Sequence, residues 1–296
     1  MALLNLVGAR NPYSTNIDIM GIEEIIRLIN EEEKTVPFIV EREIPKIVEV
    51  AKRSLSAIET GGRLIICGAG SSSGRLVESE AEQLQPSYGM DPTKILAISF
   101  GLGGSLDLIE DLENKEENGE LELQKINLCA KDVVIGVSAT GGTPSIIGCF
   151  MYSIKVGALK IALCCNIGSK LEELADISII TPVGPEVIIE SARHKGGTAH
   201  KMVLDMITTS IVVKLGYTYS NIKVGIPTTK PNLREKGLNF IMEATRCSRE
   251  IADFHLKECK GNIRTAIYMI LNNITSAEKA ELKLKGNNWC IRKETI

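Results

Sequence analysis

The sequence lacks the features that mark three broad classes of protein. No window holds 18 uninterrupted apolar residues, so no membrane span is expected. Lys and Arg form no long run and the net charge is −3, which argues against nucleic acid as a partner, since such binding needs a concentrated basic surface. The first residues have a short apolar start without a basic segment or a long apolar core, so a signal peptide is not expected.

The eight cysteines lack the spacing of a metal or redox site. None forms a CxxC pair, and most lie inside apolar runs, as do Cys164 and Cys165. They are therefore interpreted as small core side chains in the reducing cytoplasm. The three histidines, His194, His200 and His255, lack metal-ligand spacing as well, and no metal is expected.

Five short apolar runs alternate with helical patterns in the middle of the chain. The runs are RLIICGAG, KILAISF, DVVIGVSAT, LKIALCCN and ISIITP. Strands that are apolar throughout indicate a parallel sheet covered by helices on both faces. We therefore predict an α/β domain over residues 55–220, with a doubly wound five-stranded parallel sheet.

Helical patterns flank this domain on both sides. Residues 1–54 are predicted as an N-terminal helical segment, and residues 235–296 as a small helical domain in which Ser248 caps a helix. A long apolar helix is predicted at residues 198–216. Its pattern is compatible with a subunit contact and equally with ordinary core packing.

Two loops rich in Gly, Ser and Thr follow the first and third apolar runs. They read GAGSSSGRL at residues 68–76 and ATGGTP at residues 139–144, and both lead into a predicted helix. In open parallel sheets, ligands bind at the carboxyl ends of the strands, where the strand order reverses. Such loops present N–H groups, hydroxyls and a helix N-terminus, which suit a phosphate dianion, although one such loop alone can be a simple turn. Neither is a Walker loop or a dinucleotide fingerprint.

The predicted ligand-binding residues lie in these two loops and in a third polar stretch, GPEVIIESARHKGGTAHK. The third stretch precedes a helix and could close over an anionic ligand. Acidic segments, VESEAEQLQ and DLIEDLENKEE, could supply a general acid and base or could be solvated helix faces. The predicted binding residues are Gly70, Ser71, Ser72, Ser73, Thr140, Gly141, Thr143, Glu186, Ser191, Lys195 and Thr198.

Together these segments resemble the N-acetylmuramic acid 6-phosphate etherase family. Matching stretches run in family order from about residue 10 to about residue 275, and include NPYSTNID, LINEEEKTVP, GGRLIICGAGSSSGRL, ITPVGPEV and SARHKGGTAHKMVLDMITTS. The resemblance implies a sugar-isomerase (SIS) domain with a flavodoxin-like sheet, a ubiquitin-associated-like helical tail, a homodimer and no cofactor. It implies a phosphorylated amino sugar as ligand, converted to N-acetylglucosamine 6-phosphate and D-lactate in peptidoglycan recycling.

Carried over by position, the family's two carboxylates fall on different residue types. Glu113 matches the base that removes the C2 proton, whereas Gln83 stands at the acid position, with Glu82 one residue earlier. Gly142 stands where the family commonly has arginine, and Ala192 and His194 also depart from the usual residues. Besides the lyase, two alternatives remain open: a sugar-phosphate-binding regulator without catalysis, and a phosphosugar isomerase.

Overall fold

The computed structural model describes residues 6–101 and 111–292. The chain divides into two compact units, Met1–Ala81 with Thr93–Thr208, and Glu82–Pro92 with Thr209–Ile296. The first unit holds a parallel sheet and its covering helices, and the second is mainly helical. No helix within the described ranges is both long and apolar enough to cross a membrane.

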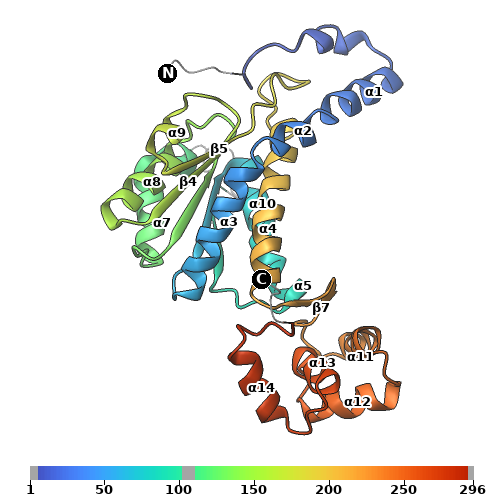
Figure 1. The fold of residues 1–296 in the computed structure, drawn as a ribbon. Helices are drawn as coiled ribbons and strands as arrows, with labels where there is room; N and C mark the ends of the chain where they lie inside the picture. Colours follow the sequence, from blue (N-terminus) through green and yellow to red (C-terminus); the bar gives the residue numbers. More distant parts are fainter. Residues whose placement is uncertain (1–5, 102–110, 293–296) are drawn as a thin grey trace. The chain divides into compact units, whose positions relative to one another are not determined.

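The sheet of the first unit confirms the predicted α/β fold. Its five strands are all parallel and lie in the order β2-β1-β3-β4-β5, so that the order reverses between β1 and β3. Figure 1 shows α7 (Glu116–Lys125) and α8 (Pro144–Val156) on one side of the sheet and α3 (Ile44–Glu59) on the other. Each predicted apolar run contains one strand. The strands are β1 (Leu64–Ala69), β2 (Ile95–Phe100), β3 (Val133–Val137), β4 (Leu159–Cys164) and β5 (Ile177–Ile180).

Both faces of the sheet are covered, which explains why the strands are apolar throughout. Ile65 and Cys67 of β1 belong to a core cluster with Phe150 of α8 (Pro144–Val156). Because side chains alternate along a strand, Leu64 and Ile66 face the other side, where α3 contacts the sheet. All four β1 side chains are fully buried, as a two-sided core requires.

The remaining helices of the first unit follow the predicted pattern with one interruption. The acidic stretch after β2 is helical at residues 111–113, breaks at Asn114 and Lys115, and resumes in α7; its residues 102–110 lie outside the described part. The helices are α1 (Ile22–Glu33), α2 (Val36–Glu41), α3 (Ile44–Glu59), α4 (Arg75–Glu82), α7 (Glu116–Lys125), α9 (Lys170–Leu174) and α10 (Lys195–Lys214), of which α4 and α10 continue into the second unit.

The second unit has its own apolar core. Leu238, Ile241, Leu256 and Ile267 pack together there, and Val224 and Leu284 belong to the same cluster. Ser248 caps α12 as predicted, its side chain accepting the N–H of Ile251. The unit contains α5 (Leu84–Tyr88), the hairpin β6 (Thr218–Tyr219) and β7 (Ile222–Lys223), α11 (Pro231–Thr245), α12 (Arg249–Glu258), α13 (Ile263–Leu271) and α14 (Ala277–Lys285).

Candidate functional site

The first loop forms a single π-helical turn, Gly70–Gly74, between β1 and α4. Gly70 has a φ of +69°, a conformation that side chains other than glycine rarely adopt. A methyl group added to Gly70 would lie only 2.8 Å from Oε1 of Glu113. The structure therefore brings the carboxylate of Glu113, a residue predicted to act as a base, against the backbone of the predicted phosphate loop.

A cavity of about 230 Å³ opens beside this loop. It is lined by Ser71, Ser72, Ser73, Leu76, Arg193, Gly197 and His200. Three hydroxyl-bearing residues and one guanidinium-bearing residue thus border the same space. Hydroxyl donors together with an arginine form the set that proteins use to hold a phosphate, because charge-assisted hydrogen bonds are the strongest available.

The second loop follows β3, the strand that pairs with β1 in parallel register. Ser138 and Thr143 are hydrogen-bonded through their hydroxyls at 2.8 Å, and the N–H of Gly141 donates to Ser138 Oγ at 3.1 Å. Gly141 has a φ of +68°, and an added methyl group would lie 2.2 Å from Ser169 Oγ. This loop is therefore tightly folded, with Thr140 left exposed at its tip.

The start of α10 lies beside both loops. Gly197 lines the cavity next to the three serines, and a methyl group on Gly196 would lie 3.8 Å from Ala139 Cβ, at the start of the second loop. Two loops and a helix N-terminus thus meet where the strand order reverses, as expected for a ligand site in an open parallel sheet.

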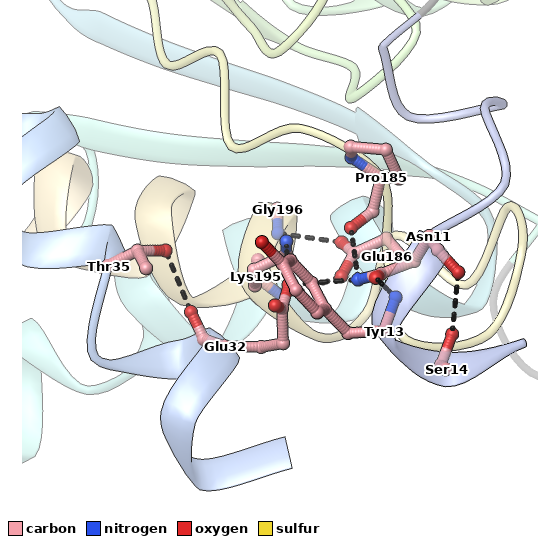
Figure 2. A network of polar contacts seen from close by, with 9 residues as sticks. All are labelled: Asn11, Tyr13, Ser14, Glu32, Thr35, Pro185, Glu186, Lys195 and Gly196. Carbon is pink, nitrogen blue, oxygen red and sulfur yellow. Dashed lines mark hydrogen bonds and ion pairs between the residues drawn. The ribbon is translucent and has the colours of Figure 1, made fainter. Parts of the chain in front are cut away.

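Several charged groups of the third polar stretch are hydrogen-bonded or ion-paired within the protein (Figure 2). The fully buried Glu186 carboxylate accepts the N–H groups of Lys195 at 3.0 Å and of Gly196 at 2.9 Å. Burial raises the pKa of Glu186, and the two N–H donors oppose that rise. The Lys195 ammonium lies 2.6 Å from Oε2 of Glu32 in α1. Of the other predicted residues in this stretch, Ser191 is half-buried and Thr198 is exposed.

His200 is a buried histidine behind the serine loop. Its Nε2 lies 3.5 Å from Cys165 Sγ, and the side chain is 1% exposed. Burial lowers the pKa of His200 to about 4, because a charged imidazolium would lose its hydration. The wall of the cavity at this position is therefore a neutral imidazole at pH 7.

The carboxylates that follow the first loop have different surroundings. Glu78 accepts a hydrogen bond from Ser99 of β2, and Glu80 is buried and accepts one from Thr208 at 2.5 Å. Burial raises the pKa of Glu80. Gln83, at the family's acid position, and the preceding Glu82 are both exposed. They are the first residues of the Glu82–Pro92 segment of the second unit.

Four cavity-lining residues were not among the predicted site residues: Leu76, Arg193, Gly197 and His200. Arg193 lies within the polar stretch that the sequence had singled out, but nothing distinguished it from its neighbours. Arg193 lies in the turn just before α10, and Gly197 and His200, three residues apart, lie on one face of that helix. That spacing was the available signal, and it required knowing where α10 begins.

Comparison with known sequences gives matches over nearly the whole chain. A family model described as the SIS domain matches residues 29–165. An N-acetylmuramic acid 6-phosphate etherase from Photorhabdus laumondii is 40% identical over 287 residues, covering 96% of this chain and 94% of the relative. Another of the same name, from Caldanaerobacter subterraneus, is 40% identical over 281 residues, covering 95% of this chain and 91% of the relative.

Comparison with solved structures supports the fold. A phosphoheptose isomerase from Francisella tularensis superposes with a TM-score of 0.51 at 19% identity, covering 66% of this chain and 100% of the isomerase. At that identity the likeness concerns the fold alone, and it agrees with the α/β fold described above.

Proposed function

The chain belongs to the N-acetylmuramic acid 6-phosphate etherase family, and we propose that it is itself a carbon–oxygen lyase of this specificity. Its substrate is then N-acetylmuramic acid 6-phosphate, a phosphorylated amino sugar with a lactyl ether at C3. Water and this substrate give N-acetylglucosamine 6-phosphate and D-lactate. The near-complete coverage of both chains supports the proposal, because the relatives match the helical ends as well as the SIS domain.

The observation that carries the proposal is the position of Glu113. Its carboxylate lies against Gly70 in the loop whose three serines line the cavity. A phosphosugar held by that loop would have a carboxylate close by, and proton abstraction next to a carbonyl needs a positioned base. In the opened sugar, the C1 aldehyde acidifies the C2 proton and delocalises the resulting carbanion.

The proposed reaction proceeds in two halves. Glu113 takes the C2 proton, the electron pair forms a C2–C3 double bond, and the C3–O bond breaks with departure of lactate. Water then adds its oxygen to C3 and a proton returns to C2. The lactate alkoxide is a poor leaving group, so a proton must be supplied to it as the bond breaks.

The phosphate is assigned to the serine loop. Ser71, Ser72 and Ser73 supply hydroxyl donors, and Arg193 supplies the positive charge. Within the described residues, Arg193 forms no ion pair with a carboxylate, whereas the Lys195 ammonium is paired with Glu32. Arg193 is therefore the cation that remains available at this cavity.

The proton donor must be a residue other than Gln83, which stands at the family's acid position. A glutamine can donate a hydrogen bond but cannot deliver a proton, which leaves Glu82 as the neighbouring candidate. General acid catalysis contributes roughly 10²–10⁴-fold to such reactions, so the identity of this residue decides whether lactate leaves quickly.

The test measures D-lactate release from N-acetylmuramic acid 6-phosphate by the native chain and by Gln83→Glu. Brisk release by the native chain supports the lyase, with Glu82 as the proton donor to examine next. Activity gained only by Gln83→Glu would mark a phosphosugar-binding regulator built on the lyase frame. Absence of release from both would turn the search to other phosphosugars and to isomerase activity. Gln85→Glu, an exposed change in the same segment, serves as the matched control.

We extend the proposal to a homodimer in the cytoplasm. Ile22 and Ile26 are 78% and 61% exposed, and their spacing puts them on one side of α1; Ile19, in the short turn before this helix, is 80% exposed. An apolar stripe of this kind is typical of a covered surface. Eight free thiols fit a reducing compartment. Light scattering of the native chain and of Ile22→Glu tests the dimer, because a monomeric native chain would contradict it.

A further inference from the structure

We propose that Glu32 is a positioning residue for the phosphosugar site and that it acts through Lys195. Glu32 lies near the end of α1, and Lys195 is the first residue of α10. The inference rests on the proposed function insofar as the cavity beside the serine loop binds the phosphosugar. It assigns a role in that binding to the N-terminal part of the chain, which lies far from the loops in sequence.

The ion pair between Glu32 and Lys195 is buried. Lys195 Nζ lies 2.6 Å from Glu32 Oε2, and the two side chains are 4% and 15% exposed. A buried ammonium is strongly unfavourable unless a carboxylate compensates it. A lysine at the N-terminus of a helix is also disfavoured by the helix dipole. Glu32 therefore compensates the Lys195 ammonium at this position, in addition to the nearby Glu186 carboxylate.

Further hydrogen bonds join the same pair to the loop before α10 (Figure 2). Asn11 Nδ2 donates to Glu32 Oε2 at 2.9 Å and to the Pro185 carbonyl at 3.3 Å. The next residue, Glu186, accepts the N–H groups of Lys195 and Gly196. Three segments of the chain are thereby fixed to the first turn of α10 by groups that are largely buried.

The residues on either side of Lys195 line the cavity. Arg193 lies two residues before it and Gly197 two residues after it, and both border the serine loop. The Glu32 contact therefore sets the distance between the Arg193 guanidinium and the serine hydroxyls. Positioning matters at this scale, because a misplacement of about 1 Å can cost on the order of 10²-fold in rate.

The N-terminal segment is also attached to the second loop. The N–H groups of Leu6 and Val7 donate to Asn166 Oδ1 at 2.9 and 3.2 Å. The amide of Asn166 in turn donates to the Thr140 carbonyl at 3.4 Å. The chain before α2 thus supports the carboxyl end of the sheet at two places, which agrees with a role in holding the site.

The experiment compares Glu32→Gln, Lys195→Met and the double variant with the native chain. Glu31→Gln is the matched control, since Glu31 lies on the same helix and pairs with Lys34 on the surface. Three quantities are measured: thermal unfolding, calorimetric binding of N-acetylglucosamine 6-phosphate, and KM and kcat for D-lactate release. Glu32→Gln should lower kcat/KM on the order of 10²-fold, mainly through KM and with a matching loss of product affinity.

The double variant separates positioning from a merely structural role. Removing both charges relieves the uncompensated ammonium, so thermal stability should recover toward the native value. Product affinity should stay weak, because the contact that places Arg193 is still missing. Recovery of affinity together with stability would overturn the proposal, as would a Glu32→Gln protein that binds the product as the native chain does.

Failure of the lyase proposal would look different. A native chain that binds N-acetylglucosamine 6-phosphate without releasing D-lactate would refute the lyase, and weakened binding in Glu32→Gln would still support the positioning role. A native chain that binds neither this sugar phosphate nor inorganic phosphate would overturn both proposals.

Discussion

Two polar segments at the carboxyl end of the sheet use their polar side chains in different ways. Ser71, Ser72 and Ser73 of the first loop line an open cavity. Glu186 and Lys195 of the third stretch are buried: the Glu186 carboxylate accepts the backbone N–H of Lys195, and the Lys195 ammonium pairs with Glu32. The hydroxyl groups of the first segment can therefore hydrogen-bond a ligand, whereas the charged groups of the second segment bond to other parts of the protein and stabilise the fold.

The comparison shows that residue type does not reveal whether a polar group is available. What decides availability is the presence of an internal partner, and that partner can come from anywhere in the chain. For Lys195 it is 163 residues away. A segment with its partners already in place rigidifies the site, whereas a segment without them can bind the substrate.

The largest expected effect comes from replacing a carboxylate beside the cavity, Glu113, and comparing the result with replacement of the buried carboxylate of Glu186. Glu113→Gln should lower kcat by roughly 10²–10⁴-fold, because a base is lost. Glu186→Gln should lower the free energy of unfolding by about 1–3 kcal/mol, because one of its two backbone N–H groups loses an acceptor. Steady-state kinetics and thermal unfolding of both variants check this. A stable, fully active Glu186→Gln would remove the distinction.

The pH dependence of the free energy of unfolding tests the buried His200 in the wall of the cavity. The pKa of His200 is lowered to about 4 in the fold, so between pH 6.5 and 4 the unfolded chain binds a proton that the folded chain does not. Stability is therefore lost as the pH falls through that window. His200→Gln should lose about 2 kcal/mol less than the native chain between pH 7 and pH 5. Urea unfolding at the two pH values measures the difference, and equal losses would contradict the prediction.

Removal of the available cation should weaken substrate binding. Arg193→Met should raise KM roughly 10- to 100-fold, since a hydrogen bond to a charged group contributes about 1.5–3 kcal/mol. Its stability should stay close to native, because the side chain is exposed. Arg42→Met, an exposed change elsewhere in the first unit, is the control. An unchanged KM in Arg193→Met would show that the phosphate is held by other groups.

The smallest effect comes from two glycines in the loops. Gly70→Ala forces alanine into a left-handed conformation and against Glu113, so stability should fall by about 1–2 kcal/mol. Gly142→Ala has only Thr140 Oγ1 nearby, at 3.8 Å, and should change stability by less than about 0.5 kcal/mol. Denaturant unfolding of the pair decides the point, and similar losses in both would refute it.

The fold was predictable because each strand is a continuous apolar run. A run such as RLIIC can only be buried on both faces, which requires helices on both sides and hence a parallel sheet. The neighbouring positions of β1 and β3 followed from the loops that end them. The break at Asn114 was not anticipated. Within the predicted helical domain α14 was not singled out, although Ser276 caps its start.

The site was less predictable than the fold. The serine loop and Glu113 could be named because glycines, hydroxyls and the family resemblance coincide there. Arg193 and His200 could not, since their place on the cavity depends on the residue at which α10 begins. Lys195 forms an ion pair with Glu32, which is far away in the sequence, and no local sequence pattern predicts such a contact.

The thiol behind the cavity has a consequence for oxidative damage. Cys165, in contact with His200, has its pKa raised by burial to about 12, and burial raises the pKa of the adjacent Cys164 to about 11. At pH 7 the reactive thiolate is then present at a level on the order of 10⁻⁴ or lower. Peroxide and alkylating reagents should therefore attack the exposed Cys129 first, and Cys164 and Cys165 at the carboxyl end of the sheet only later.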